Sequence, residues 1–343
     1  MDYVELLGQS NPENPIRKAF ENKTEYYSDF LKTITVLQKY LTTAQMNSLL
    51  RQKLQLGKQS FNENSYYEAA TEVSVIAKFA SIPFSTFLYE TPTIVGTKKN
   101  PECTIVSEGV TINVEAKCPN LDNLIPFSNS EKTLVFDTYG RHPDYEELYL
   151  DLKRAIEEQN SNVSVLKEKH KDNTLKDFLE SAHSKFPEAI DDNTINILVV
   201  SLDNYFTFNK WFSYLFGYQG LFLELPFADP ANYSRVDAII FSNLQYRHRN
   251  NTSIMNSAWD FDDAFTLFFS NGHRQRLKDA AFNFTLQHIK NYTEEMKQYR
   301  ESIEYKGFLA DVDDMENEFL IPTFIKEHLE KQKNEFYWDF SPQ

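Results

Sequence analysis

The stretch NPECTIVSEGVTINVEAKCP, residues 100–119, decides the fold because it predicts a tight β-hairpin. Polar and apolar residues alternate over 111–117. This period of two is typical of a strand with one face in the core and one face in water. Glu108 and Gly109 fit the turn between the two strands. The wet face of the second strand then carries Glu115 and Lys117.

The register of this hairpin brings two acidic residues together. A two-residue turn pairs residues whose numbers sum to 217, and a four-residue loop over 107–110 keeps the same register. Glu102 then faces Glu115, with Cβ atoms about 4.5–5.5 Å apart. Two carboxylates at that separation repel each other unless a proton or a cation lies between them. A three- or five-residue loop would shift the register and separate the pair.

This combination of residue types suits the hydrolysis of a phosphodiester bond. Hard divalent cations take oxygen ligands, and Mg²⁺ uses one or two carboxylates together with water and substrate phosphate. The metal would activate water, while Lys117 would position that water or stabilise the transition state. The alternative is that Glu115 and Lys117 are solvated charges on an exposed strand, a pattern that many proteins carry by chance.

Composition and charge restrict the function classes. The chain has 343 residues, 41% of them hydrophobic, with 28 Phe and 19 Tyr, so disorder of the whole chain is excluded and one large or two ordinary domains are expected. Only nine glycines argue against a glycine-cradled cofactor fold. The net charge of −15 counts against a surface coated in positive charge for nucleic acid. The P-loop, HExxH and GxSxG motifs are absent from the sequence.

Cysteine usage and the apolar segments predict the compartment. Cys103 and Cys118 have neither metal-site spacing nor a disulfide framework, which favours a reducing compartment. Residues 1–15 lack the basic and apolar regions of a signal peptide. The apolar runs are far shorter than the roughly 20 residues that span a membrane. We therefore expect a soluble, cytoplasmic protein without membrane contact.

Periodicity along the chain predicts an α/β core. We expect helices at 14–58, 66–80 and 144–160, a strand after Pro83, the hairpin, strands at 194–202 and 233–246, and a helical pattern again from 258. This order predicts a central mixed sheet flanked by helices. The predicted segments are an N-terminal helical segment (1–59), a core (60–250) with a helical insertion at about 161–193, and a C-terminal helical region (251–343).

The run PECTIVSEGVTINVEAK, residues 101–117, resembles the PD-(D/E)xK nuclease motif, which has a Pro-acid pair, a short hairpin and then acid-x-Lys. The core of that superfamily runs helix, three strands, helix, strand, and the order predicted from about 60 to 245 is similar. The chain departs from the pattern at Glu102, where Asp is usual. The resemblance implies a restriction-endonuclease-like core with N- and C-terminal helical extensions. It also implies a Mg²⁺ site, which Mn²⁺ could fill, formed by Glu102, Glu115 and the main-chain carbonyl of Ala116, with Lys117 catalytic.

The same family often places a further glutamate on the helix before the first strand. Glu68 and Glu72 stand at i and i+4 of the expected helix 66–80, hence on one face. We prefer Glu72 as the additional metal-site and catalytic residue because it lies nearer the strand that leads into the hairpin. Glu68 is the second choice, and ordinary exposed helix charges are the alternative for both.

Several basic residues are weaker candidates for contacts with a nucleic-acid backbone. The helix at 144–160 is expected to be the crossover helix after the third core strand, and short basic clusters occupy 245–251 and 271–278. For the helix, we favour the alternative of solvated charges. The candidates are Lys153, Arg154, Arg247, Arg249, Arg274 and Arg276.

The sequence therefore predicts a Mg²⁺-dependent endonuclease acting on DNA, in defence against foreign DNA or in a mobile element. RNA remains open as a substrate. The alternative is a nuclease-fold protein that has lost cleavage and acts as a nucleic-acid-binding or scaffold subunit, which the acidic charge and the helical flanks support. A homodimer or a partner protein also remains open, because the aromatic segment 205–227 could be a dimer surface as well as part of the core.

Overall fold

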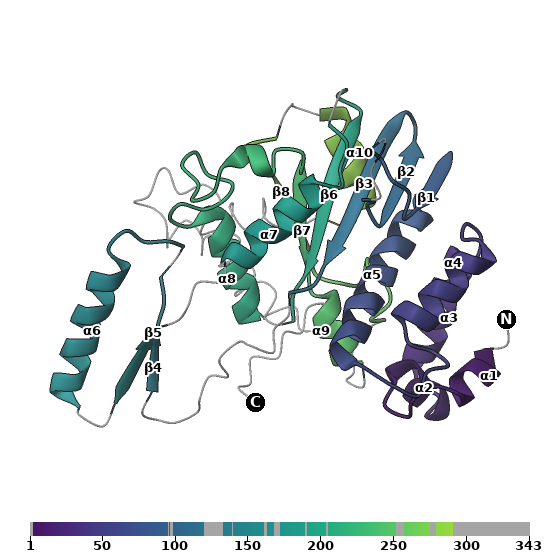
Figure 1. Ribbon diagram of the computed structural model, residues 1–343, viewed down its shortest axis with the longest axis horizontal. Coiled ribbons are helices and arrows are strands. Elements are labelled where there is room, and N and C mark those ends of the chain that lie inside the picture. Colours follow the sequence, from purple (N-terminus) through teal and green to yellow (C-terminus); the bar gives the residue numbers. More distant parts are fainter. Residues whose placement is uncertain are drawn as a thin grey trace, which may run out of the picture.

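The computed structural model describes residues 3–94, 96, 99–119, 133–138, 140–160, 163–167, 172–188, 191–203, 205–251, 257–274 and 279–290 (Figure 1). Its helices are α1 (Tyr3–Gly8), α2 (Pro15–Glu21), α3 (Glu25–Leu37), α4 (Thr43–Ser48), the π-helix η1 (Leu49–Lys53), α5 (Glu63–Ser81), α6 (Tyr145–Gln159), α7 (Asp172–His183), α8 (Tyr205–Phe216), the 3₁₀-helix η2 (Pro230–Asn232), α9 (Leu244–Arg249) and α10 (Asp279–His288). Its strands are β1 (Thr86–Tyr89), β2 (Cys103–Ser107), β3 (Val110–Lys117), β4 (Thr133–Phe136), β5 (Ser164–Lys167), β6 (Thr194–Ser201), β7 (Ala238–Ser242) and β8 (Thr266–Ser270).

The protein has an α/β fold built on a six-stranded mixed sheet in the order β1-β2-β3-β6-β7-β8. The first three strands form an antiparallel meander, β6 and β7 run parallel to β3, and β8 closes the sheet antiparallel to β7. The predicted class, a mixed central sheet flanked by helices, is confirmed. Strands β4 and β5 form a separate parallel pair that lies with α6 at one end of the molecule (Figure 1).

The central hairpin has the predicted turn and register. Ser107 pairs with Val110, so the loop contains two residues, and both have positive φ: 50° at Glu108 and 81° at Gly109. This is the backbone that a type I′ turn requires, and glycine adopts it without steric cost. Thr104 pairs with Asn113, as predicted. The numbers of paired residues therefore sum to 217 along β2 and β3, which confirms the predicted register.

Helices cover both faces of the sheet. On one face, α5, α10 and the N-terminal helices pack against apolar side chains of β2, β3 and β6, such as Ile112 and Val114. On the other face, α7 and α8 pack against β6, β7 and β8. Strand β6 is therefore buried on both sides, which is why residues 194–202 read as a continuous apolar run.

A buried polar network joins the N-terminal helices to this body. The hydroxyl of Tyr26 on α3 lies 2.9 Å from that of Tyr66 on α5 and 3.0 Å from Nδ1 of His248 on α9. Burial lowers the pKa of His248 to about 3, with the charge of the adjacent Arg247 adding to the effect, so the ring is neutral in the folded protein. Neutral hydrogen bonds therefore fix α3 against α5.

Three expectations about individual elements are wrong. The helical pattern expected from 258 contains strand β8, because a short apolar run such as TLFFS fits either a strand or a buried helix. The strand expected at 233–246 is the shorter β7, followed by the helix α9. The insertion expected to be helical at about 161–193 contains strand β5 as well as the helix α7.

The crossover helix also differs from the prediction. The helix predicted at 144–160 forms as α6, but it packs on β5 and buries only Tyr145 among the side chains along its length. Instead, α7 contributes Leu175, Leu179 and Ala182 to the core beneath β6, the strand that pairs with β3. Among the residues described above, no helix is both long and apolar enough to cross a membrane.

Candidate active site

The β2–β3 hairpin positions three of the predicted site residues at its open end. Glu102 directly precedes β2, and its N–H donates at 2.9 Å to the carbonyl of Val114, the residue that already pairs with Cys103. The regular ladder therefore ends at Cys103 and does not include the predicted pairing of Glu102 with Glu115. Glu115 lies within β3, and its side chain is fully buried. Lys117 ends β3 with about a quarter of its side chain exposed, and its Nζ lies 2.7 Å from Oε1 of Glu115. The prediction that this face of β3 is exposed to water is therefore wrong at Glu115.

Helix α5 brings the predicted glutamates to the same place. Its first turn is capped by Asn62, whose side chain accepts from the N–H of Ser65. Glu72 is hydrogen-bonded to Glu102, while Glu68 lies near enough to Lys117 for the ammonium charge to oppose the rise that burial causes in the pKa of Glu68. The two glutamates line one pocket of about 280 Å³ together with Glu102, Ala116, Lys117 and Cys118.

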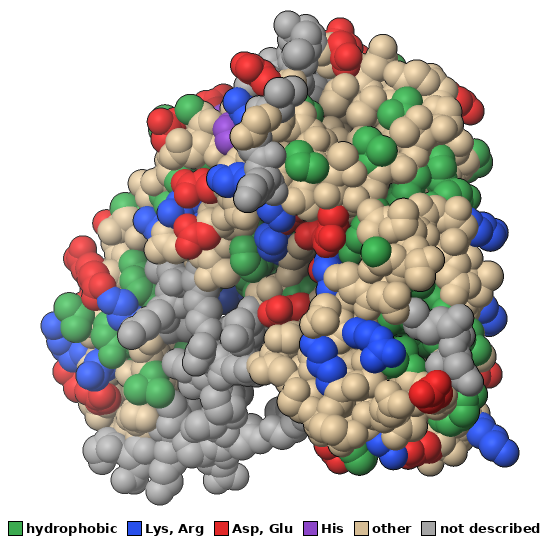
Figure 2. Space-filling model, turned by 45° about the vertical axis from the view of Figure 1, so that its right-hand side comes forward, with side chains coloured by type: hydrophobic (Ala, Val, Ile, Leu, Met, Phe, Trp, Pro, Cys, Tyr) green, Lys and Arg blue, Asp and Glu red, His purple; other side chains and the backbone are tan. Residues whose placement is uncertain are grey.

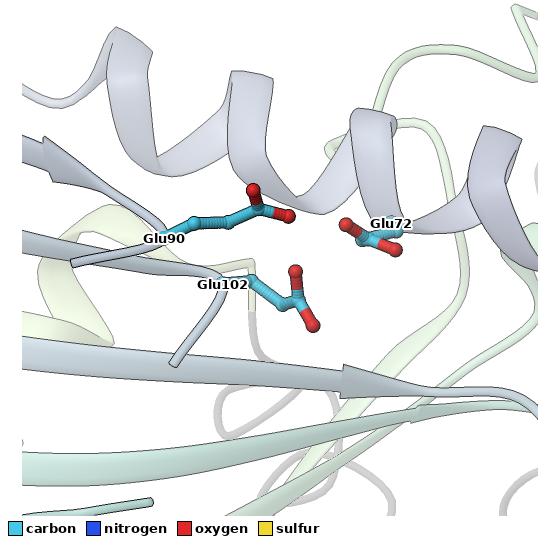
Figure 3. A group of neighbouring side chains, drawn as sticks. All are labelled: Glu72, Glu90 and Glu102. Carbon is cyan, nitrogen blue, oxygen red and sulfur yellow. The ribbon is translucent and has the colours of Figure 1, made fainter. Parts of the chain in front are cut away.

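Two residues that the sequence analysis missed extend this site. Glu90 follows β1, and one carboxylate oxygen from each of Glu72, Glu90 and Glu102 lies within 4.8 Å of the others (Figure 3). Lys53, at the end of η1, forms ion pairs with all three. No local motif marks Lys53 or Glu90, since each comes from a different segment of the chain.

A third lysine also lies in the site. Lys185, two residues after α7, has its Nζ 2.5 Å from Oε1 of Glu115 and 4.0 Å from Oε1 of Glu102. Both Lys117 and Lys185 therefore contact the same oxygen of Glu115. The other oxygen, Oε2, is buried and has no hydrogen-bond partner in the part of the chain that the structure describes.

The carboxyl groups perturb one another strongly. Burial, and then the charge of Glu102, raise the pKa of Glu72 well above its usual range. Burial acts to raise the pKa of Glu102 as well, but the hydrogen bond from Glu72 and the nearby ammonium groups outweigh it and hold that pKa low. The pKa of Glu72 is therefore higher than that of Glu102. Burial, and then the charge of Glu102, raise the pKa of Glu115 despite its two lysine contacts.

The lysines balance most of this negative charge. Burial acts to lower the pKa of Lys53 and of Lys117, but the surrounding carboxylates outweigh it and raise both. Both ammonium groups are therefore charged at neutral pH. In the described cluster, three lysines therefore face four glutamates, Glu72, Glu90, Glu102 and Glu115.

The donor set fits a hard divalent cation. Such ions bind carboxylate oxygens, and the orphaned Oε2 of Glu115 is an acceptor that a cation would satisfy. Glu72 and Glu102 line the pocket that begins at Ala116, the residue after Glu115, and it is with Glu90 rather than Glu115 that they bring three carboxylate oxygens within 4.8 Å of one another. Burial raises the pKa of Cys118 to about 12, so its thiol stays protonated and unsuited to ligation.

The basic residues on α6 do not reach this site. Lys153 pairs with Glu157 at 3.9 Å and Arg154 with Asp151 at 3.4 Å, and all four side chains are substantially exposed. On the face drawn in Figure 2, Lys and Arg side chains of the described residues alternate with Asp and Glu and form no continuous basic strip.

The remaining basic candidates behave differently from one another. Arg247 is only 2% exposed and donates to the carbonyl of Ser257 at 2.8 Å, so its expected role as a surface phosphate contact is wrong. Arg249, on the same helix, donates to Asn64 at 3.0 Å and lies over the ring of Tyr67, within electrostatic range of Glu68. It is the basic candidate nearest to the carboxylates by these contacts.

Of the basic candidates in 271–278, Arg274 belongs to the part of the chain that the structure describes. Its guanidinium donates to the carbonyl of Asn271 at 2.9 Å and lies over the ring of Phe282. Both contacts are local and leave the side chain partly buried. Arg276 lies outside the described residues.

Comparison of the chain with known protein families, with curated proteins and with solved structures found no match. The resemblance carried by residues 101–117 therefore has no support from a matching relative. Any conclusion on function must rest on the geometry and charge of the site itself.

Proposed function

We propose that this protein is a Mg²⁺-dependent nuclease with a restriction-endonuclease-like core, which hydrolyses phosphodiester bonds in DNA. The observation that carries the proposal is the buried, unpartnered Oε2 of Glu115, one residue before Ala116 and Lys117, which line a pocket together with Glu72 and Glu102. A buried carboxylate that lacks a partner is costly unless a cation joins it. RNA remains the second substrate class.

The topology around the pocket supports the proposed core. With β4, α6 and β5 left out as an insertion between β3 and α7, the order α5, β1, β2, β3, α7 and β6 is helix, three strands, helix, strand, and β6 pairs parallel with β3. The acid-x-Lys sequence lies at the end of β3, beside the strand that carries Glu102. This is the arrangement that the resemblance implied for residues 60–245.

Each side chain has a task that follows from its position. Glu102, Glu115 and Glu72 would hold the metal, and Ala116 would add its main-chain carbonyl. Bound Mg²⁺ supplies a Lewis acid and lowers the pKa of a coordinated water. Lys117 keeps a fixed positive charge at the mouth of the pocket, where it attracts and orients a phosphate oxygen of the substrate. The buried wall of β3 excludes bulk water behind Glu115.

The proposal is tested by cleavage assays on plasmid DNA, linear duplex, single-stranded DNA and RNA with Mg²⁺ or Mn²⁺. Lys117→Ala and Glu115→Gln should each lower the cleavage rate by about 10²–10³-fold, the usual effect of removing one preorganised electrostatic group. Glu157→Gln is the matched control, because its carboxylate is exposed on α6 and its loss should leave the rate unchanged. Equal rates in all four proteins would overturn the proposal.

A second function is favoured by the three lysines. Lys53, Lys117 and Lys185 already neutralise the carboxylates, as expected of a nuclease-fold protein that has lost cleavage and serves as a nucleic-acid-binding or scaffold subunit. Calorimetric titration with Mn²⁺ separates the two functions. Binding that Glu115→Gln abolishes supports the nuclease, whereas a wild-type protein that neither binds Mn²⁺ nor cuts any substrate supports the second function. A role in defence or in a mobile element, and a cytoplasmic location, remain proposals alongside either function.

A further inference from the structure

Lys53 reaches the site from outside the proposed nuclease core. It ends η1, the π-helical turn that continues α4 in the N-terminal helical segment. Leu49, Leu50 and Leu54 around it are fully buried, and α5 packs directly against η1. The backbone that carries Lys53 is therefore fixed, and about three quarters of its side chain is buried over the pocket.

The ammonium group of Lys53 occupies the centre of the carboxylate cluster. It forms an ion pair with Glu72, lies 2.6 Å from Oε1 of Glu90 and lies 3.5 Å from Oε2 of Glu102. These are the three carboxylates that come within 4.8 Å of one another in Figure 3. The three carboxylate oxygens that surround the ammonium group of Lys53 could equally surround another small cation in the same position.

A divalent cation on Glu102 and Glu72 would lie within a few ångströms of this ammonium. At that range the two cations repel each other, and the partial burial of the side chains around them limits screening by water. Lys53 has somewhere to move, since its Nζ already lies 5.7 Å from the centre of the Tyr89 ring. The face of an aromatic ring holds an ammonium group favourably.

We propose that Lys53 is an internal counter-ion, which holds Glu72, Glu90 and Glu102 together without metal and competes with a divalent cation for the same oxygens. The inference rests on the proposed function, because it takes the divalent cation from there. It assigns a role to the N-terminal helical segment: this segment sets the metal concentration at which the site is loaded.

The test measures Mn²⁺ binding by calorimetry for wild type, Lys53→Gln and Lys53→Arg. Lys53→Gln keeps hydrogen-bond donors but removes the competing charge, so its dissociation constant should fall at least about tenfold. Lys53→Arg restores the charge and should stay near wild type. Lys58→Gln is the matched control, since it removes the same charge from a lysine that pairs only with Gln52 among the described contacts.

A second measurement uses the wild-type protein, so it does not depend on whether a variant folds. Acetylation requires access of the reagent to the amine, and about three quarters of the Lys53 side chain is buried, so displacement of its ammonium group by a metal ion would expose it. Mn²⁺ should therefore increase the acetylation of Lys53, followed by mass spectrometry of its peptide, and leave Lys58 unchanged.

The outcomes separate this inference from the proposed function. Tighter binding by Lys53→Gln, together with faster acetylation of Lys53, supports the counter-ion role. Equal Mn²⁺ affinity in wild type and Lys53→Gln, or acetylation that Mn²⁺ does not change, overturns it and leaves the nuclease proposal standing. A wild type that binds no Mn²⁺ overturns the metal site itself, unless Lys53→Gln binds, which would support a counter-ion too strong for the metal to displace.

Discussion

Replacing Glu115 by Gln should abolish metal binding without destabilising the metal-free protein. Most buried ion pairs do not behave in this way, because removing one partner leaves the other charge buried and alone, at a cost of about 3–5 kcal/mol. Here the partners are two lysines whose side chains are 26% and 21% exposed. Both ammonium groups can turn to water when the carboxylate is removed.

The expected magnitude follows from the two opposing effects at this carboxylate. At an effective dielectric constant of about 20, one ammonium group 2.5–2.7 Å from Oε1 gives roughly 6 kcal/mol of attraction before solvent screening. Burial of the ionised group, with Oε2 unpartnered, opposes this attraction, and the raised pKa of Glu115 shows that burial and the charge of Glu102 win. We therefore expect the free energy of unfolding to change by less than about 1 kcal/mol near pH 7, in favour of the glutamine.

The pH dependence gives the sign of the effect. A carboxyl group whose pKa is higher in the folded than in the unfolded protein contributes stability that is fully present below its unfolded pKa and is lost as pH rises through its folded pKa. Glu115 is such a group, with an ordinary pKa of 4.5. The glutamine side chain of the Glu115→Gln variant does not titrate, so the variant should gain stability relative to wild type as pH rises above the ordinary pKa of 4.5.

Urea unfolding in EDTA, followed by tryptophan fluorescence at three pH values, measures this difference. Glu157→Gln, exposed on α6, serves as the control and should show no trend with pH. Calorimetry with Mn²⁺ on the same samples should detect binding to wild type and none to Glu115→Gln. A loss of more than about 3 kcal/mol at pH 8, the cost of breaking a buried ion pair, would refute the reasoning, as would unchanged Mn²⁺ affinity.

Two further predictions concern residues around the site. Asn113 is buried and links Thr104 to Asn196 through hydrogen bonds of 2.7 and 2.8 Å. Asn113→Leu should therefore lower the free energy of unfolding by about 2–3 kcal/mol in urea titrations. An unchanged free energy of unfolding would contradict the network. Arg247→Met should destabilise the fold without changing how DNA binding depends on salt. Arg249→Met should weaken DNA binding and reduce its salt slope by about one phosphate contact, and the reverse pattern in fluorescence anisotropy would contradict the burial of Arg247.

The hairpin could be predicted because its determinants are local. The alternation over 111–117 sets the face of each side chain, and Glu108-Gly109 sets the loop length, so turn and register follow from about twenty residues. The same argument placed α5 to within three residues at its start, since its apolar pattern lies in one stretch. Strand β8 could not be distinguished in this way, because five apolar residues satisfy either period and only the partner strand β7 decides between them.

The rest of the site could not be predicted because its members meet only through tertiary packing. Lys53 lies 49 residues before Glu102, and Lys185 lies 70 residues after Glu115. Each follows a different helix, and the crossover helix that delivers Lys185 was expected to be α6 rather than α7. A lysine at the end of a helix is common, and nothing in its own neighbourhood marks it as part of a carboxylate cluster.

The burial of Glu115 links the fold to the proposed chemistry. Alternation alone predicts that its face of β3 is wet, and that would be correct if only one layer of helices covered the sheet. Helix α7 and Lys185 cover the second face, so the polar positions of β3 become interior positions that need partners. Asn113 is hydrogen-bonded to a neighbouring amide. In Glu115, one carboxylate oxygen contacts two lysines, and the other oxygen has no hydrogen-bond partner among the described residues. An acidic strand position that is buried and half satisfied is what a cation site requires, and it explains why the polar face of this hairpin contains acids and lysines rather than amides alone.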